Sequence, residues 1–577
     1  MDIMDIYQKW LSNRHLNSSL KRELMKIVGM RDEIEDRFYR TLDFGTAGIR
    51  GVMGAGTNRM NIYTVGAAAR GFGEWILDKN KEKQGIIISY DSRNNSHEFA
   101  LISARILGSM GINVLLSDQI RPVPMLSYGI RYYKCAGGIM ITASHNPPEY
   151  NGFKAYGESG GQLMPDEASC VKTNIDCTED IFEAVDNALP LDELISKGII
   201  NYIGDELDEA YDEEILSFFK DEAEDRSYRN KLKIVYTPLN GAGNIPVRRI
   251  LSKLGFEQVF VVNEQENPDG NFSTMKVPNP ELPDTFDLAI KTATAVFADI
   301  IIATDPDSDR LGIAVRDSDG NYRVLKGNEI GIILMEYILT MKNSRNEIPS
   351  NGFCVTSIVS TKLTKKICKR YGIKLYQVFT GTKHIADRIN ELDEHGDEKF
   401  IFGFEESHGY MVDADIRDKD AVSSAAIISE IAAFSKFSNM TLLDQLDSIY
   451  ALYGYAADES YSMICTGENG QKQIKKAMEY YRNIAENNDG KLGEEGSRLG
   501  EIPVTRYRDF LPKSNVLMFE IGEYDFITMR PSGTEPKLKI YFGCYGKKNE
   551  ARIRLAKISG MVLMDVNRVI DSSPIES

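Results

Sequence analysis

Residues 142–147 carry the side chains of a covalent catalyst, with Ser144 beside His145. The stretch follows the apolar run 138–141, so it is predicted to be a polar loop at the end of a buried strand. A serine in such a loop is expected to be exposed, and His145 or the downstream Lys154 can take up its proton. This arrangement is typical of a nucleophile or a phosphoryl carrier. A plain exit from a strand would be the simpler explanation if the stretch stood alone.

A second candidate site has three carboxylates at alternate positions: Asp305, Asp307 and Asp309. Oxygen ligands spaced in this way can converge on a hard divalent cation, and Mg²⁺ is the natural choice. Without a cation the three negative charges would repel one another, which favours metal binding over a bare acidic turn. A calcium loop of the EF-hand type is excluded, because Arg310 and Arg316 stand at its glycine and glutamate positions.

Two more polar loops follow apolar strands. In residues 403–409, adjacent acid and hydroxyl groups suit recognition of neighbouring sugar hydroxyls, although an exposed polar turn explains them as well. In residues 530–537, two prolines and a glycine restrict the backbone while other side chains supply hydrogen-bond donors. Such turns present backbone amides to anions, and Arg530 at the mouth favours phosphate binding over a plain turn.

Buried strands must position these loops, and the sequence predicts them. Residues 85–90 and 112–116 have the apolar character of strands, and the helical pattern of 97–107 lies between them. This alternation indicates α/β units with buried sheets. The pattern begins again at 233–236 and at 352–357, and each new unit ends in an apolar strand followed by a polar loop. We therefore expect three α/β units that each provide one functional loop.

The length of 577 residues exceeds what one hydrophobic core usually organises, so several domains are expected. The first forty residues have a helical pattern, and a last helix is predicted over 550–569. The predicted domains are 1–205 with the serine loop, 206–320 with the metal-binding loop, 321–445 with the sugar-binding loop and 446–577 with the phosphate-binding loop.

The composition excludes several classes of protein. Apolar residues make up 42% and charged residues 27% of the chain, which is ordinary for a globular protein. The formal net charge of −17 argues against binding to nucleic acid or to membranes, although a local basic cluster can still hold an anionic substrate. The seven scattered cysteines form no C-x-x-C pair, the amino terminus lacks a signal pattern, and no apolar run reaches about 18 residues. These features predict a cytoplasmic protein with reduced thiols.

Together the four loops resemble the signature motifs of the α-D-phosphohexomutases, a family that includes phosphoglucomutases and phosphomannomutases. The similarity runs in the correct order over residues 43–545 and includes Tyr150–Lys154 after the serine loop. Residues 269–272, 276–281 and 415–420 are similar to the branch that contains bacterial phosphoglucomutases and phosphopentomutase-like enzymes. The resemblance implies an α/β fold of four domains, namely three α/β domains with mixed sheets and a smaller C-terminal α+β domain, around a central cleft.

The resemblance also implies a reaction. Ser144 would carry a phosphoryl group, and Asp305, Asp307 and Asp309 would hold Mg²⁺ together with an oxygen of that phosphoserine. Ser144 would pass its phosphoryl group to the substrate, giving a glucose 1,6-bisphosphate intermediate, and would then take back the other one. The expected enzyme is an Mg²⁺-dependent isomerase that interconverts glucose 1-phosphate and glucose 6-phosphate. Its expected partners are small-molecule sugar phosphates, and its expected oligomeric state is a monomer or a weak homodimer.

Further residues match family positions with roles near the substrate. Lys154 and His145 match positions proposed for proton transfer; a lysine there would need a lowered pKa to act as a base, and the sequence does not choose between the two. Arg50, in a glycine-rich loop, would lie near the serine, and Arg310 would bind the transferring phosphoryl group. The expected substrate-binding residues are Thr382, Lys383, Glu405, Ser407, Lys419, Arg530, Ser532, Gly533, Thr534 and Lys537.

The preferred sugar stays open. Thr382 stands where glucose- and mannose-type members of the family often have tryptophan or histidine, in a region that helps decide which face of the sugar is bound. Glu405 and Ser407 would bind hydroxyls that glucose and mannose share. Mannose and pentose phosphates are therefore alternative substrates. A slow sugar phosphatase and a non-catalytic sensor are further alternatives; the intact serine, aspartates and Arg530 argue against the sensor.

Overall fold

The computed structural model describes the chain as two compact units. The first unit comprises Met1–Leu334, Asn351–Val355 and Gly381–Leu443, and the second comprises Met335–Ser350, Thr356–Thr380 and Asp444–Ser577. Among the described helices, none combines the length and the apolar composition that crossing a bilayer requires. The residues described are 2–45, 48–219, 226–465, 470–487, 498–532 and 537–571, apart from the side chains of 393–395, 486–487 and 571.

Three helices form the beginning of the chain, where the sequence predicted a helical pattern. Asn17 separates the first two, and its side chain caps the second by accepting hydrogen bonds from two backbone amides. The ring of Trp10 makes edge-to-face contacts with Phe38, Tyr63 and Phe182, which join these helices to the next part of the fold. The helices are α1 (Ile3–Ser12), α2 (Ser18–Lys26) and α3 (Arg31–Phe38).

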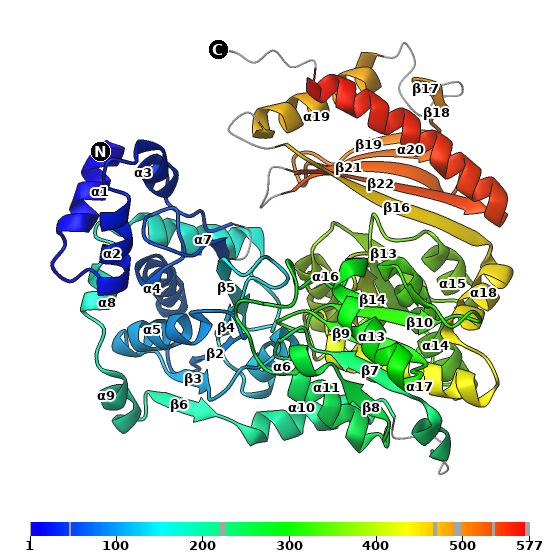
Figure 1. Ribbon diagram of the computed structural model, residues 1–577, viewed down its shortest axis with the longest axis horizontal. Helices are drawn as coiled ribbons and strands as arrows, with labels where there is room; N and C mark the ends of the chain where they lie inside the picture. Colours follow the sequence, from blue (N-terminus) through cyan, green and yellow to red (C-terminus); the bar gives the residue numbers. More distant parts are fainter. Residues whose placement is uncertain are drawn as a thin grey trace. The chain divides into compact units, whose positions relative to one another are not determined.

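A six-stranded mixed sheet forms the body of the first α/β region (Figure 1). Side chains of its strand β2 alternate between two faces: Ile86 and Ile88 share a core with Phe72 and Phe99, whereas Ile87 lies against Gly129 of the helix on the other side. The strands in spatial order are β1 (Gly48–Val52), β5 (Tyr150–Gly157), β4 (Gly137–Ile141), β2 (Ile86–Tyr90), β3 (Val114–Ser117) and β6 (Ile200–Ile203). The helices of this region are α4 (Ile62–Asp78), α5 (Ser96–Ser109), α6 (Val123–Tyr132), α7 (Pro165–Asp176), α8 (Glu183–Asp186), α9 (Leu191–Ser196) and α10 (Asp205–Ser217).

The second α/β region has a five-stranded sheet. Its strands β9, β7 and β8 are parallel, with β8 at the edge, and β9, β10 and β11 form antiparallel hairpins. The strands in spatial order are β11 (Tyr322–Val324), β10 (Leu311–Arg316), β9 (Ile300–Thr304), β7 (Ile234–Thr237) and β8 (Val259–Val261). The helices are α11 (Asn244–Lys253), α12 (Asn263–Glu266) and α13 (Asp287–Val296), with 3₁₀ turns at Ser227–Lys231 and Pro283–Phe286.

The third α/β region has a four-stranded sheet. Asp420 caps α17, a helix buried over most of its length, by accepting hydrogen bonds from the amides of Val422 and Ser423. This helix packs against α11 and against β9 and β10 of the second region. The strands in spatial order are β13 (Lys374–Val378), β12 (Gly352–Ser357), β14 (Lys399–Glu405) and β15 (Gly409–Met411). The helices are α14 (Gly327–Ser344), α15 (Leu363–Tyr371), α16 (Thr382–His395), α17 (Ala421–Phe437) and α18 (Leu442–Tyr453).

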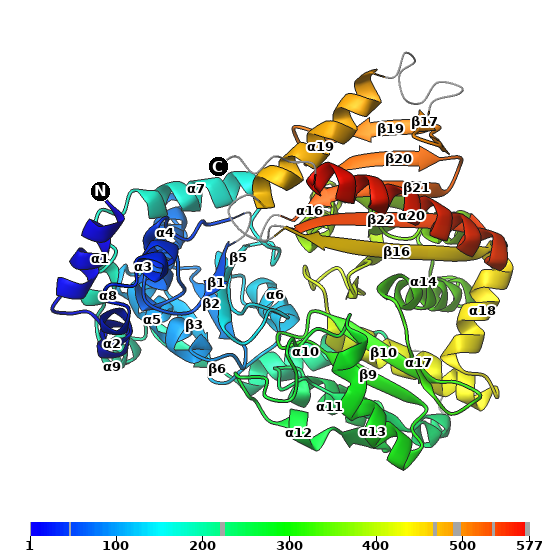
Figure 2. The same ribbon diagram turned by 45° about the horizontal axis from the view of Figure 1, so that its top comes forward.

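The C-terminal region is an antiparallel sheet with two long helices on one face (Figures 1 and 2). The strands in spatial order are β16 (Tyr455–Ile464), β22 (Lys537–Gly546), β21 (Asp525–Pro531), β20 (Leu517–Ile521) and β19 (Arg506–Asp509), with a separate small hairpin of β17 (Arg498–Leu499) and β18 (Ile502–Pro503). The helices are α19 (Gly470–Asn487) and α20 (Lys548–Asp571). The predicted fold class, three α/β domains followed by an α+β domain, is confirmed. The predicted domain boundaries stay predictions.

Lys362, at the N-cap position of α15 in the second unit, is a buried lysine. It is 4% exposed, its Nζ donates to the carbonyl oxygen of Ile358 at 2.8 Å, and it lies 4.8 Å above the ring of Phe526. Burial lowers the pKa of Lys362 to about 7, with smaller effects from nearby Lys365, Glu520, Arg508 and Asp458. An unfolded chain keeps this proton to about pH 10, so between these two values the unfolded state binds more protons and stability rises with pH.

Lys362→Met is therefore expected to raise the free energy of unfolding near neutral pH, because methionine fills similar space without a charge. The gain should shrink by about 1–3 kcal/mol as the pH rises to about 9.5, because less free energy is then needed to keep the buried lysine of the parent protein neutral. Urea unfolding of both proteins across this range measures the difference. Lys365→Met, at a half-buried position in the same helix, is the control. A difference between Lys362→Met and parent that stays constant with pH would contradict the assignment.

Candidate active site

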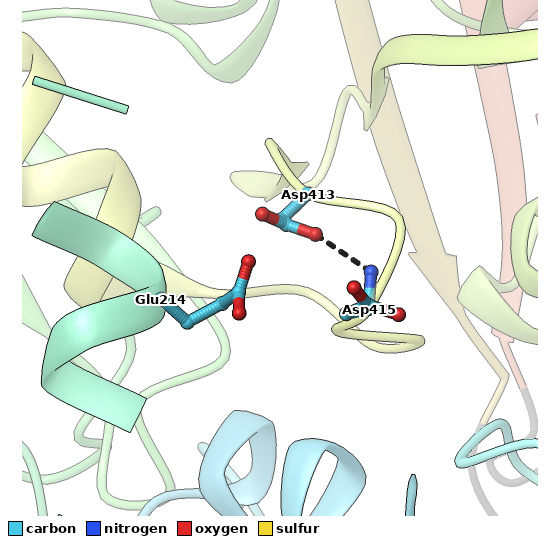
Figure 3. Close-up of side chains that lie close together, drawn as sticks. All are labelled: Glu214, Asp413 and Asp415. Carbon is cyan, nitrogen blue, oxygen red and sulfur yellow. Dashed lines mark hydrogen bonds between the residues drawn. The ribbon is translucent and has the colours of Figure 1, made fainter. Parts of the chain in front are cut away.

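Two groups of three carboxylates among the described residues lie close enough to share a metal ion. The first consists of Glu214, Asp413 and Asp415 (Figure 3). Glu214 lies in α10, and the two aspartates lie in the loop after β15. Asp415 is exposed and its carboxylate forms an ion pair with Arg131 at 2.7 Å, so this group already has a cation beside it. The second group is Asp305, Asp307 and Asp309, and all three are buried. The second group is the one that contacts Ser144.

Ser144 lies in the loop between the antiparallel strands β4 and β5, as the sequence predicted. The two strands are paired up to Ile141 and Phe153, and the chain between them must turn back sharply. Ser144 has a φ of +51°, a left-handed conformation that residues with a Cβ adopt rarely. The expectation that the serine is exposed was wrong: its exposure is 3%, and its hydroxyl lies against Asp305 of the β9–β10 turn.

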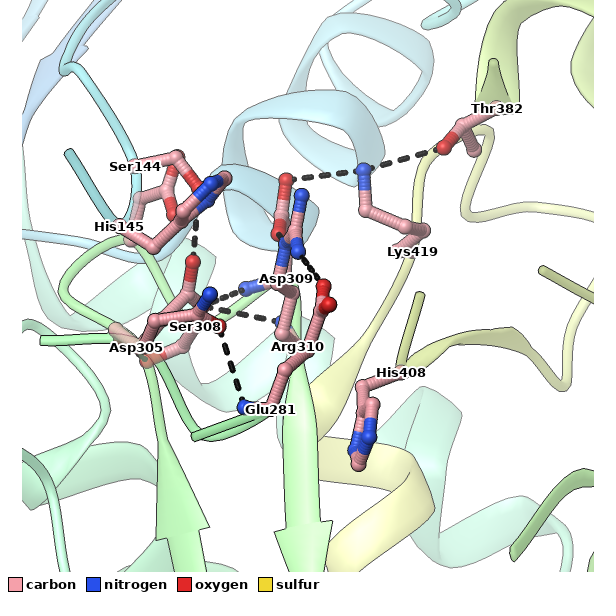
Figure 4. A network of polar contacts seen from close by, with 12 residues as sticks. Ser144, His145, Glu281, Asp305, Ser308, Asp309, Arg310, Thr382, His408 and Lys419 are labelled. Atoms are coloured by element: carbon pink, nitrogen blue, oxygen red, sulfur yellow. Dashed lines mark hydrogen bonds and ion pairs between the residues drawn. The ribbon is translucent and has the colours of Figure 1, made fainter. Parts of the chain in front are cut away.

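The hydroxyl of Ser144 contacts both an acid and a base (Figure 4). Its Oγ donates to Oδ2 of Asp305 at 2.7 Å and lies 3.2 Å from Nδ1 of His145. Its backbone N–H donates to Oγ1 of Thr142 at 2.8 Å. A serine held in this way presents its oxygen directly to the carboxylate cluster.

The three aspartates occupy the turn of the β9–β10 hairpin, and the turn is closed by its own first residue. Oδ1 of Asp305 accepts hydrogen bonds from the amides of Asp309 (3.1 Å) and Arg310 (3.0 Å). Ser308 supplies a second left-handed residue, with a φ of +53°. Oxygens of the three carboxylates lie within 4.8 Å of one another as a result.

Two helix starts fix this turn from outside. The amide of Val123, at the first residue of α6, donates to the carbonyl oxygen of Asp307 at 2.9 Å. The amide of Ala421, at the first residue of α17, donates to the carbonyl oxygen of Ser308 at 3.1 Å. Because amides at a helix start have no partner within the helix, the first and third α/β regions both hold the turn that belongs to the second.

The cluster fits a hard divalent cation. Oδ1 of Asp307 and Oδ1 of Asp309 are buried and make no hydrogen bond, which leaves oxygen ligands of the type Mg²⁺ prefers. Burial, together with the charges of Asp307 and Asp309, raises the pKa of Asp305 well above its ordinary value. Burial would also raise the pKa of Asp309, but the nearby positive charges of Lys419, Lys154 and Arg310 outweigh burial and lower that pKa.

Three cations surround the carboxylates. Nζ of Lys154 lies 2.7 Å from Asp307 and 3.4 Å from Asp309, and Nζ of Lys419 lies 3.0 Å from Asp309. Arg310 forms an ion pair with Glu281, which the sequence did not single out. Burial alone would lower the pKa of Lys154, but Asp307 and Asp309 raise it above its ordinary value. Lys154 therefore keeps its proton in this state. His145, by contrast, contacts the hydroxyl of Ser144 directly.

The third loop joins the same network. Glu405, at the end of β14, accepts hydrogen bonds from the amide of Gly381 at 2.6 Å and from the hydroxyl of Thr382 at 3.0 Å. That hydroxyl accepts in turn from Nζ of Lys419 at 3.0 Å (Figure 4). Burial lowers the pKa of Lys383, the next residue, to about 8. Ser407 is half-buried in the turn that follows Glu405.

The remaining expected residues lie in other parts of the fold. Nη1 of Arg50 donates to the side chain of Asn146 in the serine loop at 2.8 Å, which agrees with a place near Ser144. Arg530 lies at the end of β21 in the second unit, and the amide of Ser532 donates to the carbonyl oxygen of Lys537 at 2.7 Å. Gly533 and Thr534, which were expected to complete this loop, lie outside the described residues.

Sequence reasoning missed Asp91 and Arg93. Both side chains are fully buried and lie 3.4 Å apart, and both are connected to the serine loop. A signal was present, because these polar residues directly follow the apolar strand β2 in the way that the serine loop follows β4. Without a known partner for either residue, the pattern fitted a plain turn equally well.

Models of phosphoglucomutase/phosphomannomutase domains match three consecutive parts of the chain. The α/β/α domain I matches residues 41–181, domain II matches 209–320 and domain III matches 326–453. Each of the first three candidate loops falls inside one of these matches. The order agrees with the order of the three α/β sheets.

Curated relatives are similar over most of their length. The chain is 38% identical over 525 residues to phosphoglucomutase of Staphylococcus haemolyticus, covering 88% of this chain and 91% of that protein. It is 36% identical over 527 residues to phosphoglucomutase of Staphylococcus aureus strain MSSA476, covering 89% and 91%. The fold is similar to the open form of Paramecium parafusin, a phosphoglucomutase, with a TM-score of 0.67, 16% identity, and coverage of 93% and 98%. The resemblance predicted from the loops is confirmed, and the chain belongs to the phosphoglucomutase/phosphomannomutase family.

Proposed function

We propose that this protein is a phosphoglucomutase that interconverts glucose 1-phosphate and glucose 6-phosphate through a phosphoserine and a glucose 1,6-bisphosphate intermediate. The observation that carries this proposal is the contact of Ser144 Oγ with Asp305, 2.7 Å apart within a buried carboxylate cluster. The names of the curated relatives support the choice of glucose phosphates. The three matched domains support the same mechanism.

The residues present fit Mg²⁺ as the cofactor. Asp305, Asp307 and Asp309 would hold it, with an oxygen of the phosphorylated Ser144 beside them. When bound, the ion neutralises negative charge on the transferring phosphoryl group. Arg310, held by Glu281 next to the cluster, would bind an oxygen of the same group.

In the transfer step, the bond between phosphorus and Ser144 Oγ breaks while a substrate hydroxyl oxygen forms the new bond to phosphorus. The proton of that hydroxyl must leave, and His145 is the candidate to take it, while the protonated Lys154 is the candidate to give a proton to Ser144 Oγ. The reverse step, with the intermediate turned round, returns the other phosphoryl group to Ser144.

The third loop would bind the sugar. Glu405 and Ser407 would accept and donate hydrogen bonds to two hydroxyls, and Thr382, Lys383 and Lys419 would bind nearby. Thr382 is already fixed between Glu405 and Lys419, so its hydroxyl is placed rather than free to rotate. The loop that contains Arg530, Ser532, Gly533, Thr534 and Lys537 would hold the phosphate that does not react.

The test is a direct assay of the full-length protein. Glucose 1-phosphate, Mg²⁺ and a trace of glucose 1,6-bisphosphate should give glucose 6-phosphate, and no turnover is expected with EDTA. Mannose 1-phosphate and ribose 1-phosphate, assayed in parallel, rank the sugars by kcat/KM. A higher kcat/KM for mannose 1-phosphate or ribose 1-phosphate would show that this sugar, and not glucose, is the preferred substrate. Phosphate release faster than isomer formation would identify a phosphatase instead.

A further inference from the structure

A buried arginine lies directly behind the serine loop. Arg93 follows β2, and its side chain has no exposed surface. Its Nη2 donates to the carbonyl oxygens of Ser144 (2.5 Å) and Asn146, and its Nη1 donates to those of Pro147 (2.9 Å) and Tyr150 (3.1 Å). One guanidinium, with its rigid set of donors, therefore holds four carbonyl groups of a short loop.

Asp91 holds the same loop through a hydroxyl. Its Oδ2 accepts a hydrogen bond from Oγ1 of Thr142 at 2.6 Å, and its Oδ1 accepts one from Oγ of Ser96 at 2.7 Å. Oγ1 of Thr142 in turn accepts from the backbone N–H of Ser144 at 2.8 Å. The backbone N–H of Ser144 is thus fixed through Asp91 and its C=O through Arg93.

Fixing both sides of Ser144 has a conformational consequence. The left-handed backbone of this residue, with a φ of +51°, is disfavoured for a side chain with a Cβ and persists only where neighbouring contacts hold it. In this conformation Oγ lies 2.7 Å from Asp305. We propose that Asp91 and Arg93 are positioning residues that keep the Ser144 hydroxyl against the metal-binding carboxylates. This inference rests on the proposed function, in which Ser144 carries the phosphoryl group.

Arg93 also affects the electrostatics of the serine loop. Carbonyl oxygens are the negative ends of peptide dipoles and would repel an anionic phosphoryl group on Ser144. Because Arg93 engages four of them, that repulsion is balanced by a buried positive charge. The ring of Phe272, from the second α/β region, covers the guanidinium at 4.9 Å and helps to exclude water.

The first test is Arg93→Lys. Lysine keeps the charge but has a single nitrogen, which does not reproduce two nitrogens that hold four carbonyl groups. We expect kcat to fall about 10²-fold while KM changes little, because a misplaced serine slows the transfer step without removing any sugar contact. Amide hydrogen exchange should become faster in residues 142–150. This second measurement does not depend on activity.

Arg229→Lys is the matched control. Arg229 is also fully buried, forms an ion pair with Glu430 and donates to the carbonyl oxygen of Leu254, and these contacts lie outside the serine loop. We expect its replacement to lower the Tm and to leave kcat and the exchange of residues 142–150 unchanged. An equal loss of kcat in both variants would overturn the proposal, because it would show that buried arginines act only through stability.

Two variants of Thr142 test the positioning proposal if Arg93→Lys does not fold. Thr142→Val removes the hydroxyl that joins Asp91 to Ser144, and Thr142→Ser keeps it. We expect Thr142→Val to reduce kcat and to speed hydrogen exchange at the Ser144 amide. We expect Thr142→Ser to keep both at the values of the parent protein. Equal values for Val and Ser would overturn the proposal. A parent protein that isomerises no sugar phosphate would reject the proposed function, while the exchange data would still test the positioning role.

Discussion

Ser144→Ala is expected to abolish turnover, with kcat/KM lowered by at least about 10⁴-fold, because alanine cannot carry a phosphoryl group. The loss should be the same with every sugar phosphate, since the same serine transfers the phosphoryl group to whichever sugar phosphate is bound. The variant should also take up no phosphate from glucose 1,6-bisphosphate, which intact-mass spectrometry measures directly. Full activity in a folded Ser144→Ala protein would reject Ser144 as the carrier.

The fold should survive this change. Alanine fits the buried position, and the losses are the hydrogen bond to Asp305, worth about 1 kcal/mol, and the longer contact with His145. Ser103→Ala is the matched control, because Ser103 is a buried serine of α5 that donates only to the carbonyl oxygen of Phe99. Its stability should change by a similar amount while its activity and phosphorylation stay those of the parent.

Asp307→Asn is expected to lower kcat about 10²-fold or more and to raise the Mg²⁺ concentration for half-maximal activity at least about 10-fold. Asparagine keeps the shape but removes one of three negative charges that converge in the buried turn. A readout independent of activity is the rise in Tm on adding Mg²⁺, which should become smaller in the variant.

Glu214→Gln is the control for this experiment. Glu214 belongs to the other carboxylate group, where Arg131 already balances the charge of Asp415. Neither its Mg²⁺ titration nor its Tm shift should differ from those of the parent. If Asp307→Asn kept both parental values, the aspartates of the β9–β10 turn would not be the metal ligands.

The sequence by itself determined the elements and the chemical types of the site. Apolar runs such as Ile86–Tyr90 and Ile300–Thr304 bury both faces in a sheet, and polar residues directly after them must lie at the end of a strand. That rule predicted the serine loop, the aspartate turn and the Glu405 turn. The alternation of strands and helices predicted three α/β units, and the family resemblance implied the final α+β domain. These features are local, so a short stretch of residues contains the information for each.

Only the tertiary structure decided how the groups are paired. Ser144 meets Asp305 across 161 positions of the chain, and Arg93 meets the serine loop across 51. The same packing buried a serine that was expected to be exposed, and it raised the pKa of Lys154, which was considered as a base. Partners, burial and charge environment depend on which loops the sheet order and the helix starts bring together. No short stretch of sequence specifies that order, because it follows from the packing of the whole chain.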